Sequence, residues 1–457
     1  MKRILTLLAL AAASVASAQT AVGIPAAPAP ESAAGRPAGT AWSLNDCIDY
    51  AIENNIDVRQ RILQVERSEV SLSTARWSRM PSVSASISGN ATFGRALSSD
   101  NIYRDNNQTS GSFGVSGSLP IFQGLRIQRE IEGNKLDLAA AVQDLRRARE
   151  DVAVNVMTLY LQVLFNRELA DVARRQAELS SRQVERSRQL VEAGKQPESA
   201  RYESEALAAN DRLALTQANN NLQLALLALS QALNRESAAG FDIQIPAFDA
   251  LSLETLSRLG SVDEIYAAAA EERPHLRAER LRLQSSENNV RIARSALYPT
   301  ISASGGYGTS IYDGDPDSFW SQFRHKSSEY VGVSMNIPIF NRRATRNNIR
   351  TTQIAVRNQQ LALANAELSL RKEIEQAWYN ADAAYVKYRA AEAALASART
   401  AFDYAEQKAE AGRSTLYDFN DAKTRMEKAE SDLVQAKYEF VFRAKILDYY
   451  RGEPLRL

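Results

Sequence analysis

The side chains that most often carry nucleophilic or metal chemistry are scarce in this chain. It contains two histidines, His275 and His325, and one cysteine, Cys47. A zinc site or a Cys–His catalytic pair needs several such groups, and a single cysteine excludes a disulfide within one chain. The acids of 313–317 alternate as in a calcium loop but lack the downstream glutamate of an EF-hand, which favours a solvated loop. We expect no cofactor, no metal and no enzymatic activity.

The elements that position the remaining residues occur twice in the sequence. The segment 114–122 (GVSGSLPIF) returns as 332–340 (GVSMNIPIF), and the same offset of 218 residues relates Gly194 to Gly412. A fixed internal period indicates a duplicated structural unit. Cys47 matches Ile265 at this offset, so we interpret it as a small buried apolar residue.

The N-terminus and the charge indicate an exported protein. Lys2 and Arg3 precede an apolar run, and Ala16-Ser17-Ala18 has the form of a cleavage site, so a signal peptide is predicted. The net charge of +1 gives no reason to expect a nucleic-acid partner. No later stretch reaches the ~18 apolar residues of a membrane helix.

Two stretches, about 125–193 and 343–411, lack proline and are rich in strong helix formers. Apolar residues such as Ile374, Trp378 and Ala381 recur at spacings of three and four, which is typical of coiled-coil seams. Gly194 and Gly412 stand where a left-handed helix C-cap is wanted, and a further helix follows each. Each half therefore predicts a long coiled-coil hairpin with a glycine at its tip.

Four short segments alternate between apolar and polar residues. In 83–88 and 112–121 the apolar residues alternate mainly with serines, and the pattern returns within 300–339. Period-two segments of about ten residues are typical of tilted membrane strands; the alternative is two soluble hairpins that cap the helices. Polar loops are expected at 95–111 and 309–327. Four strands cannot close a barrel, whose smallest bacterial form has about eight strands. The residues alone do not choose between two chains and three.

The order of these elements resembles the TolC family of outer-membrane efflux proteins. The resemblance runs from about Ala41 to Gly452: a short helix (43–53), a helix, Pro81, a hairpin, the segment 119–124 (LPIFQG), a long helix, Gly194, a helix, and then the series again. It implies a mainly α fold with a membrane β-barrel. The implied assembly is a homotrimer, a trimeric α/β-barrel of the TolC type, with four strands and two long coiled-coil hairpins from each chain.

The resemblance also implies the function and the partners. It implies an outer-membrane exit duct of a tripartite efflux or type I secretion system, which passively conducts substrates from the periplasm to the exterior. The helical part would lie in the periplasm of a Gram-negative cell, and the strands would contact outer-membrane lipid. The partners would be a periplasmic adaptor (membrane fusion) protein and, through it, an inner-membrane pump of the RND or ABC type. The alternative is a non-conducting exported coiled-coil structural or adhesin stalk protein, which would not need lipid-facing alternation.

The resemblance assigns candidate site residues to both hairpin tips. In the family, rings of aspartates six and nine residues after the second tip glycine narrow the periplasmic entrance, and counting from Gly412 gives Asp418 and Asp421. The alternative is that both are ordinary residues of a helix start. The matching first-half residues are Ala200 and Glu203, so an acid is missing at the first. Residues expected to contact the adaptor are Gly194, Lys195, Gly412 and Arg413.

The expected organisation of the chain follows from the repeat. It comprises a signal peptide (1–18), a flexible leader (19–40), a first structural repeat (41–233, with its β-hairpin at 82–121), an equatorial insert (234–260), a second structural repeat (261–451, with its β-hairpin at 300–339) and a C-terminal tail (452–457).

Overall fold

The computed structural model describes residues 41–97, 100–105, 107–235, 237–246, 260–313, 315–411, 413 and 415–453. The predicted signal peptide and leader, residues 247–259 of the predicted insert, Gly412 and the last four residues of the tail lie outside these ranges. The chain divides into two compact units, and each contains parts of both sequence repeats. One unit includes Ser68–Asp137 and Gln284–Asn358, and the other includes Arg36–Arg67, Leu138–Leu283 and Gln359–Leu457.

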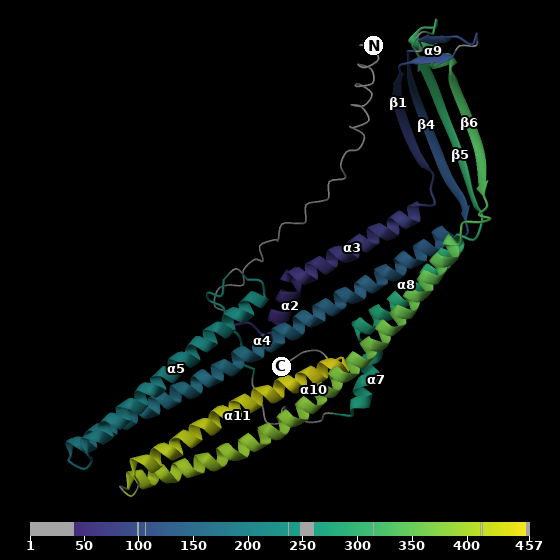
Figure 1. Cartoon of the computed structure of the whole chain (residues 1–457). Coiled ribbons are helices and arrows are strands. Elements are labelled where there is room, and N and C mark those ends of the chain that lie inside the picture. Colours follow the sequence, from purple (N-terminus) through teal and green to yellow (C-terminus); the bar gives the residue numbers. More distant parts are fainter. Residues whose placement is uncertain are drawn as a thin grey trace. The chain divides into compact units, whose positions relative to one another are not determined.

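The first unit contains an antiparallel four-stranded sheet in the order β1-β4-β5-β6 (Figure 1). Its strands are β1 (Ser82–Thr92), β4 (Gln108–Gln123), β5 (Thr300–Tyr312) and β6 (Ser327–Asn336). β4 and β5 come from different halves and pair with each other, so β1 and β6 are left as the two edges.

The register of the sheet separates apolar and polar side chains onto two faces. Ala85 lies opposite Val115, and Ala303 lies opposite Val333. On the alternate positions serines face serines: the Ser88 and Ser112 hydroxyls are 2.7 Å apart, and those of Ser302 and Ser334 are 2.9 Å apart. Because side chains alternate strictly along a strand, the predicted apolar parity is confirmed over these pairs.

The alternation predicted through Ile121 is wrong at the end of β4. A register shift between Pro120 and Phe122 places Phe122, not Ile121, opposite Ile301. Proline has no N–H to donate to the ladder and is accommodated in sheets at edges and bulges, which explains why the irregularity occurs here.

The two segments predicted as loops contain structure of their own. A two-stranded ribbon forms from β2 (Arg95–Leu97) and β3 (Tyr103–Asp105), with an ion pair of 3.3 Å between Arg95 and Asp105. Strand β5 extends to Tyr312, and the short helix α9 (Phe319–His325) follows, capped by the Ser318 side chain. The expected loops are thus shorter than predicted.

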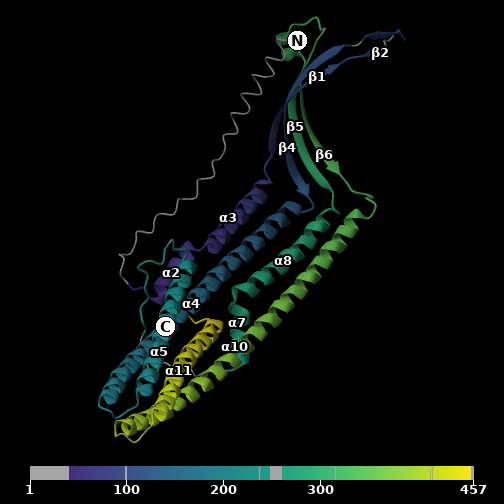
Figure 2. The ribbon, with the colours of Figure 1, turned by 60° about the vertical axis from the view of Figure 1, so that its left-hand side comes forward.

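The long helices begin and end close to their predicted bounds. α4 (Arg126–Glu192) and α10 (Ala344–Glu410) each continue into a hairpin partner, α5 (Glu198–Ala232) and α11 (Leu416–Arg451) respectively (Figure 2). The remaining helices are α2 (Leu44–Asn54), α3 (Ile56–Trp77), α7 (Val262–Glu272) and α8 (Pro274–Ser295). None of the helices in the described ranges is both long and apolar enough to cross a membrane.

Two apolar clusters hold the second unit together. The larger one packs α2 on α4, α5 and α11, and its fully buried members include Met157, Leu229 and Phe440. The smaller one surrounds Ile374 and includes Ile265. Cys47 is fully buried in the larger cluster, which confirms its interpretation as a core residue.

Candidate functional site: the helical hairpin tips

The first hairpin tip is built around Gly194. This residue has φ +65°, and an added Cβ would meet no atom within 4 Å, so glycine is favoured by conformation and not by crowding. The Lys195 N–H donates to the Leu190 carbonyl at 2.8 Å, and the Gly194 N–H donates to Val191 at 2.9 Å. These two bonds form a Schellman motif, so the predicted left-handed cap is confirmed. The Lys195 side chain is exposed.

The second tip repeats this turn and adds a side-chain cap. The Arg413 N–H donates to the Lys408 carbonyl at 2.9 Å, which is the counterpart of the Lys195 bond, and the Arg413 side chain is exposed. Gly412 itself lies outside the described residues. At the start of α11 Thr415 is the N-cap, whereas Pro197 caps α5 without a side-chain bond. Thr415 and Asp418 together form a capping box.

Asp418 is the acidic member of that capping box. Its Oδ2 accepts from the Thr415 hydroxyl at 2.6 Å and from the Thr415 N–H at 3.3 Å. These hydrogen bonds favour the carboxylate and hold the Asp418 pKa below its usual range. The side chain is exposed, so Asp418 has a capping role while its negative charge stays open to solvent.

Asp421 lies one helical turn further along α11. It forms an exposed ion pair of 3.0 Å with Arg425 in the i,i+4 relation. Its first-half counterpart Glu203 is exposed, whereas Ala200, the counterpart of Asp418, is buried. The two tips are therefore not equivalent, because only the second carries acids at both predicted positions.

A buried lysine next to this tip was missed by the sequence analysis. Lys423 on α11 has a side chain only 2% exposed, and its Nζ lies 2.8 Å from Asp211 on α5 and 3.2 Å from Glu427. It also donates to the Ser180 hydroxyl on α4 at 2.5 Å, and that hydroxyl in turn bonds Asp211. One lysine thus ties the second hairpin to both helices of the first.

The Lys423 network does not follow the internal repeat. Its counterparts at the 218-residue offset include Glu205 for Lys423 and Ala429 for Asp211. Burial raises the pKa of Glu427, and the adjacent ammonium of Lys423 opposes this shift. The i,i+4 spacing of Lys423 and Glu427 is the one signal that the sequence offers, and it is typical of exposed pairs as well.

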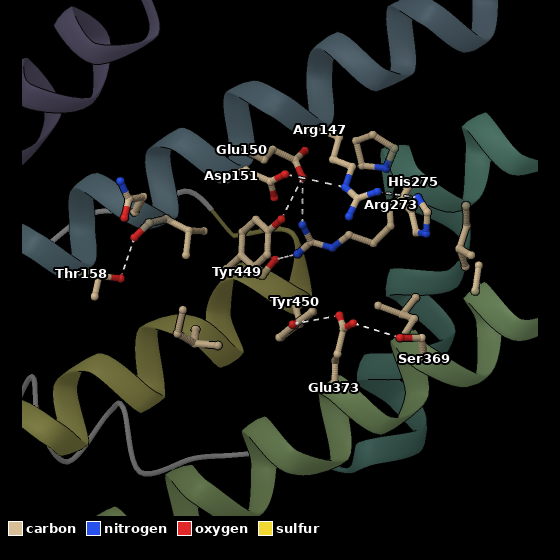
Figure 3. A pocket seen from close by; sticks show the side chains of 17 residues that line it. Arg147, Glu150, Asp151, Thr158, Arg273, His275, Ser369, Glu373, Tyr449 and Tyr450 are labelled. Carbon is tan, nitrogen blue, oxygen red and sulfur yellow. Dashed lines mark hydrogen bonds and ion pairs between the residues drawn. The ribbon is translucent and has the colours of Figure 1, made fainter. Parts of the chain in front are cut away.

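A second polar cluster lies around Arg273, at the junction of α7 and α8 (Figure 3). The Arg273 guanidinium bonds Glu150 on α4 at 3.0 Å and lies 3.6 Å from the centroid of the Tyr449 ring. The surrounding cavity of about 490 Å³ also contains Arg147, which lies 2.9 Å from Nδ1 of His275. These groups contact one another, so the cluster joins α4, α8 and α11. No group of three or more potential metal ligands occurs within the described part of the chain.

Comparison of the sequence with known protein families gives an assignment that is consistent with this fold. The sequence model of the outer membrane efflux protein family matches residues 47–235 and 265–445. The chain belongs to this family. The two matched segments correspond to the two halves of the chain, so the family match includes both hairpins, Asp418 and Asp421.

Individual relatives of this efflux protein have low sequence identity to it, but the similarity extends over most of the chain. The outer membrane efflux protein BepC of Brucella suis is 22% identical over 406 residues, which are 87% of this chain and 83% of BepC. The outer membrane protein OprJ of Pseudomonas aeruginosa is 25% identical over 67% of this chain and 62% of OprJ. Among solved structures, CusC superposes with a TM-score of 0.76 at 17% identity, covering 92% of this chain and 96% of CusC. The CmeC channel of Campylobacter jejuni gives 0.75 at 19% identity, over 90% and 85% of the two chains.

Several expectations are settled by this assignment. The efflux protein has the TolC-type fold, and it is located in the outer membrane of a Gram-negative bacterium. Its family consists of efflux channels and not of enzymes. Family membership also favours the efflux function over a stalk protein.

Proposed function

We propose that this efflux protein forms a homotrimeric exit duct that conducts substrates passively from the periplasm to the exterior. The observation that carries the proposal is a pair of open edges on each chain that complement each other. The internal repeat specifies how these edges meet. Each contact of the first half with the second half inside the chain has an equivalent contact of the second half with a first half, and only a second copy can supply that first half.

One open edge is the outer side of α3 and β1. Four apolar residues of α3 recur every seven positions, and each is more than half exposed: Ile56, Leu63, Val70 and Trp77. Such a stripe is the seam of a coiled coil without its partner helix. Strand β1 continues this edge with an unpaired row of backbone groups.

The other open edge is formed by β6 and α10. Ile354, Leu361 and Leu368 on α10 also recur every seven positions and are more than half exposed. Like β1, β6 has a neighbour on one side only within the described part of the chain. The chain therefore has two edges of the same construction but from opposite halves.

The intrachain packing of α8 on α4 shows how such edges fit. Arg282 on α8 bonds Asp144 on α4 at 2.5 Å, and β4 pairs with β5 in a defined register. At the 218-residue offset, α3 corresponds to α8 and β1 corresponds to β5. In the same way, α4 corresponds to α10 and β4 corresponds to β6. We infer that α3 and β1 of one chain pack on α10 and β6 of the next.

This head-to-tail contact is heterologous and closes as a ring. Three copies would supply twelve strands, four from each chain, which lies within the size range of outer-membrane barrels. The apolar face of each sheet would contact lipid, and the serine face would line the conduit.

The tips would form the periplasmic entrance. In a trimer Asp418 and Asp421 would each occur three times around one axis, and close carboxylates attract cations and repel one another. The exposed cations Lys195 and Arg413 would be available to a periplasmic adaptor, through which a pump of the RND or ABC type would deliver substrate.

Disulfide cross-linking tests the proposed contact directly. Gly117 lies opposite Gly305 in the β4–β5 register. At the 218-residue offset Gly117 corresponds to Met335 and Gly305 corresponds to Ile87, so Met335 of one chain should lie opposite Ile87 of the next. The variant Ile87→Cys/Met335→Cys should yield covalent trimers on oxidation. The control Ile87→Cys/Val331→Cys, which is four residues out of register, should not. Equal cross-linking in both variants, or covalent dimers as the end product, would refute the arrangement.

A further inference from the structure

The segment that follows β6 is rich in arginine and contains no acid. The loop end of the sheet, near Thr92, Gln108, Tyr312 and Ser327, carries charges of both signs. Its acids are Asp100, Asp105, Asp313, Asp315, Asp317 and Glu329, and its cations include Arg95, Arg104, Arg324 and Lys326. At the helix end no acid occurs between Glu329 and Glu367, whereas arginines stand at 342, 343, 346, 350 and 357. The opposite edge shows the same bias, since 70–94 contain Arg76 and Arg79 but no acid.

The arginines after β6 are exposed and unpaired. In the part of the chain that the structure describes, the side chains of Arg342, Arg343 and Arg346 form no ion pair and are exposed. The first-half cations near the same sheet end behave differently: Arg126 pairs with Glu130 at 2.8 Å and Arg129 with Glu132 at 3.6 Å.

The internal repeat shows that the fold does not require these arginines. At the 218-residue offset Arg342, Arg343 and Arg346 correspond to Gly124, Leu125 and Gln128, which serve the same turn and the same helix start without charge. Unpaired arginines at this helix start therefore occur in one half only, and the strand-to-helix turn does not require them.

Arg342 also occupies a position that suits glycine. Its φ is +53°, and its counterpart Gly124 has φ +60°. A residue with a Cβ in this region is strained by ~1 kcal/mol relative to glycine. Strained residues that persist where glycine would be relaxed are typical of functional positions.

The proposed trimer places a second group of arginines at the same point. A Cβ on Gly124 would lie 2.5 Å from the Ser295 carbonyl oxygen and 3.0 Å from Tyr298. The counterparts of these residues are Trp77 and Met80 of the next chain, which flank Arg79. Because Arg342 does carry a Cβ, the junction between chains must be wider than the junction within the chain.

Exposed apolar side chains border this cationic junction. Ile339 is 94% exposed and Phe340 is 81% exposed, directly before Arg342, and Trp77 is exposed on the other edge. An apolar rim next to unpaired arginines matches the two parts of a phospholipid, its acyl chains and its phosphate. Guanidinium groups bind phosphate with two parallel hydrogen bonds, which makes arginine well suited to this ligand.

We propose that each junction between chains binds an anionic phospholipid of the periplasmic leaflet. Arg342, Arg343 and Arg346 of one chain and Arg76 and Arg79 of the next hold the headgroup, and Ile339 and Phe340 contact the acyl chains. The inference rests on the proposed trimer, because neither edge alone contains the full set of arginines. The bound lipid offsets the repulsion among five cations and thereby joins neighbouring chains.

Native mass spectrometry of the purified full-length protein tests the proposal. Phosphatidylglycerol and phosphatidylcholine are titrated separately into the detergent-solubilised protein, and the lipids retained per oligomer are counted. The native trimer should retain up to three phosphatidylglycerols and prefer them to phosphatidylcholine. Arg342→Gln/Arg343→Gln/Arg346→Gln should weaken phosphatidylglycerol binding ~100-fold, and Arg76→Gln/Arg79→Gln should weaken it ~10-fold or more.

A matched control removes the same charge elsewhere. Arg182, Arg212 and Arg399 are exposed helix residues without a described ion pair, and their triple glutamine variant should bind phosphatidylglycerol within ~3-fold of the native protein. Free glycerol phosphate should not displace the lipid, because it lacks acyl chains. Native-like binding by the Arg342 triple variant, no preference over phosphatidylcholine, displacement by glycerol phosphate, or an effect limited to one edge would each overturn the site. The same spectra report the oligomer, so a monomer would refute the proposed function, whereas a trimer without lipid preference would refute this inference alone.

Discussion

Lys423 is the buried charge that joins the two helical hairpins. Its ammonium is almost fully buried and is shared by Asp211, Glu427 and Ser180 on three different helices. A buried charge is tolerated only when it is paired, and removing the lysine leaves the half-buried acids Asp211 and Glu427 without their cation. The surface pair of Asp421 and Arg425 on the same helix has no such constraint.

The Lys423→Met variant should therefore lose ~3–5 kcal/mol of stability, mostly at the tips. Hydrogen exchange of α5 and α11, followed beside thermal unfolding, measures the loss. The control Arg425→Met, on the same helix, should change stability by less than ~1 kcal/mol. Equal losses in the two variants would show that Lys423 is not energetically distinct from a surface lysine.

Asp418 and Asp421 carry the proposed gate charge. Asn can still accept from Thr415, so Asp418→Asn/Asp421→Asn should remove two charges per chain and largely keep the capping box. We expect weaker cation preference and weaker block by multivalent cations from the periplasmic side. The change should be largest at ~0.01 M salt, where the Debye length is ~30 Å.

Conductance and selectivity recordings on the double variant measure this effect. The matched control is Asp403→Asn/Asp432→Asn, which removes two exposed acids from the long helices and should leave selectivity close to native. If the two double variants behave alike, Asp418 and Asp421 are ordinary residues of a helix start.

At the scale of elements, much of the structure is predictable because periodicity and caps are local properties. The long helices start and end within a residue or so of the predicted bounds, since glycine and proline mark their ends. The bulge at Pro120, the β2–β3 ribbon and α9 were missed because each depends on contacts with a neighbouring strand or loop. Lys423 was missed for a related reason: nothing in a single helix shows that three helices enclose one side chain.

The parity of the strands makes a prediction at this scale. Val333 is 70% exposed on the apolar face of β6, and Ser334 on the other face bonds Ser302. Val333→Arg should impair outer-membrane assembly more than Ser334→Arg, because an arginine facing lipid at mid-membrane costs about 2–4 kcal/mol. Heat-resistant oligomer in outer-membrane fractions is the readout. Similar yields of the two variants would mean that the assigned faces are wrong.

At the scale of the whole molecule, the duplicated halves account for the pairing inside the chain and for its two open edges. β4 pairs with β5 and α8 packs on α4 inside the chain, and the equivalent surfaces of β1, β6, α3 and α10 remain open. In a chain of two similar halves, the first half packs on the second half inside the chain. The other side of the second half is left to pack on the first half of another copy. The proposed duct and the proposed lipid sites between its chains both follow from these two open edges.

Single-channel conductance in planar bilayers shows whether this protein is a passive duct. Trimers joined by the Ile87→Cys/Met335→Cys disulfide are inserted both with native aspartates and with Asp418→Asn/Asp421→Asn. We expect discrete conductance steps without any added energy source, and a reduced cation preference in the Asp418→Asn/Asp421→Asn trimers. Folded, inserted and cross-linked trimers that pass no current in either form would contradict the proposed passive duct.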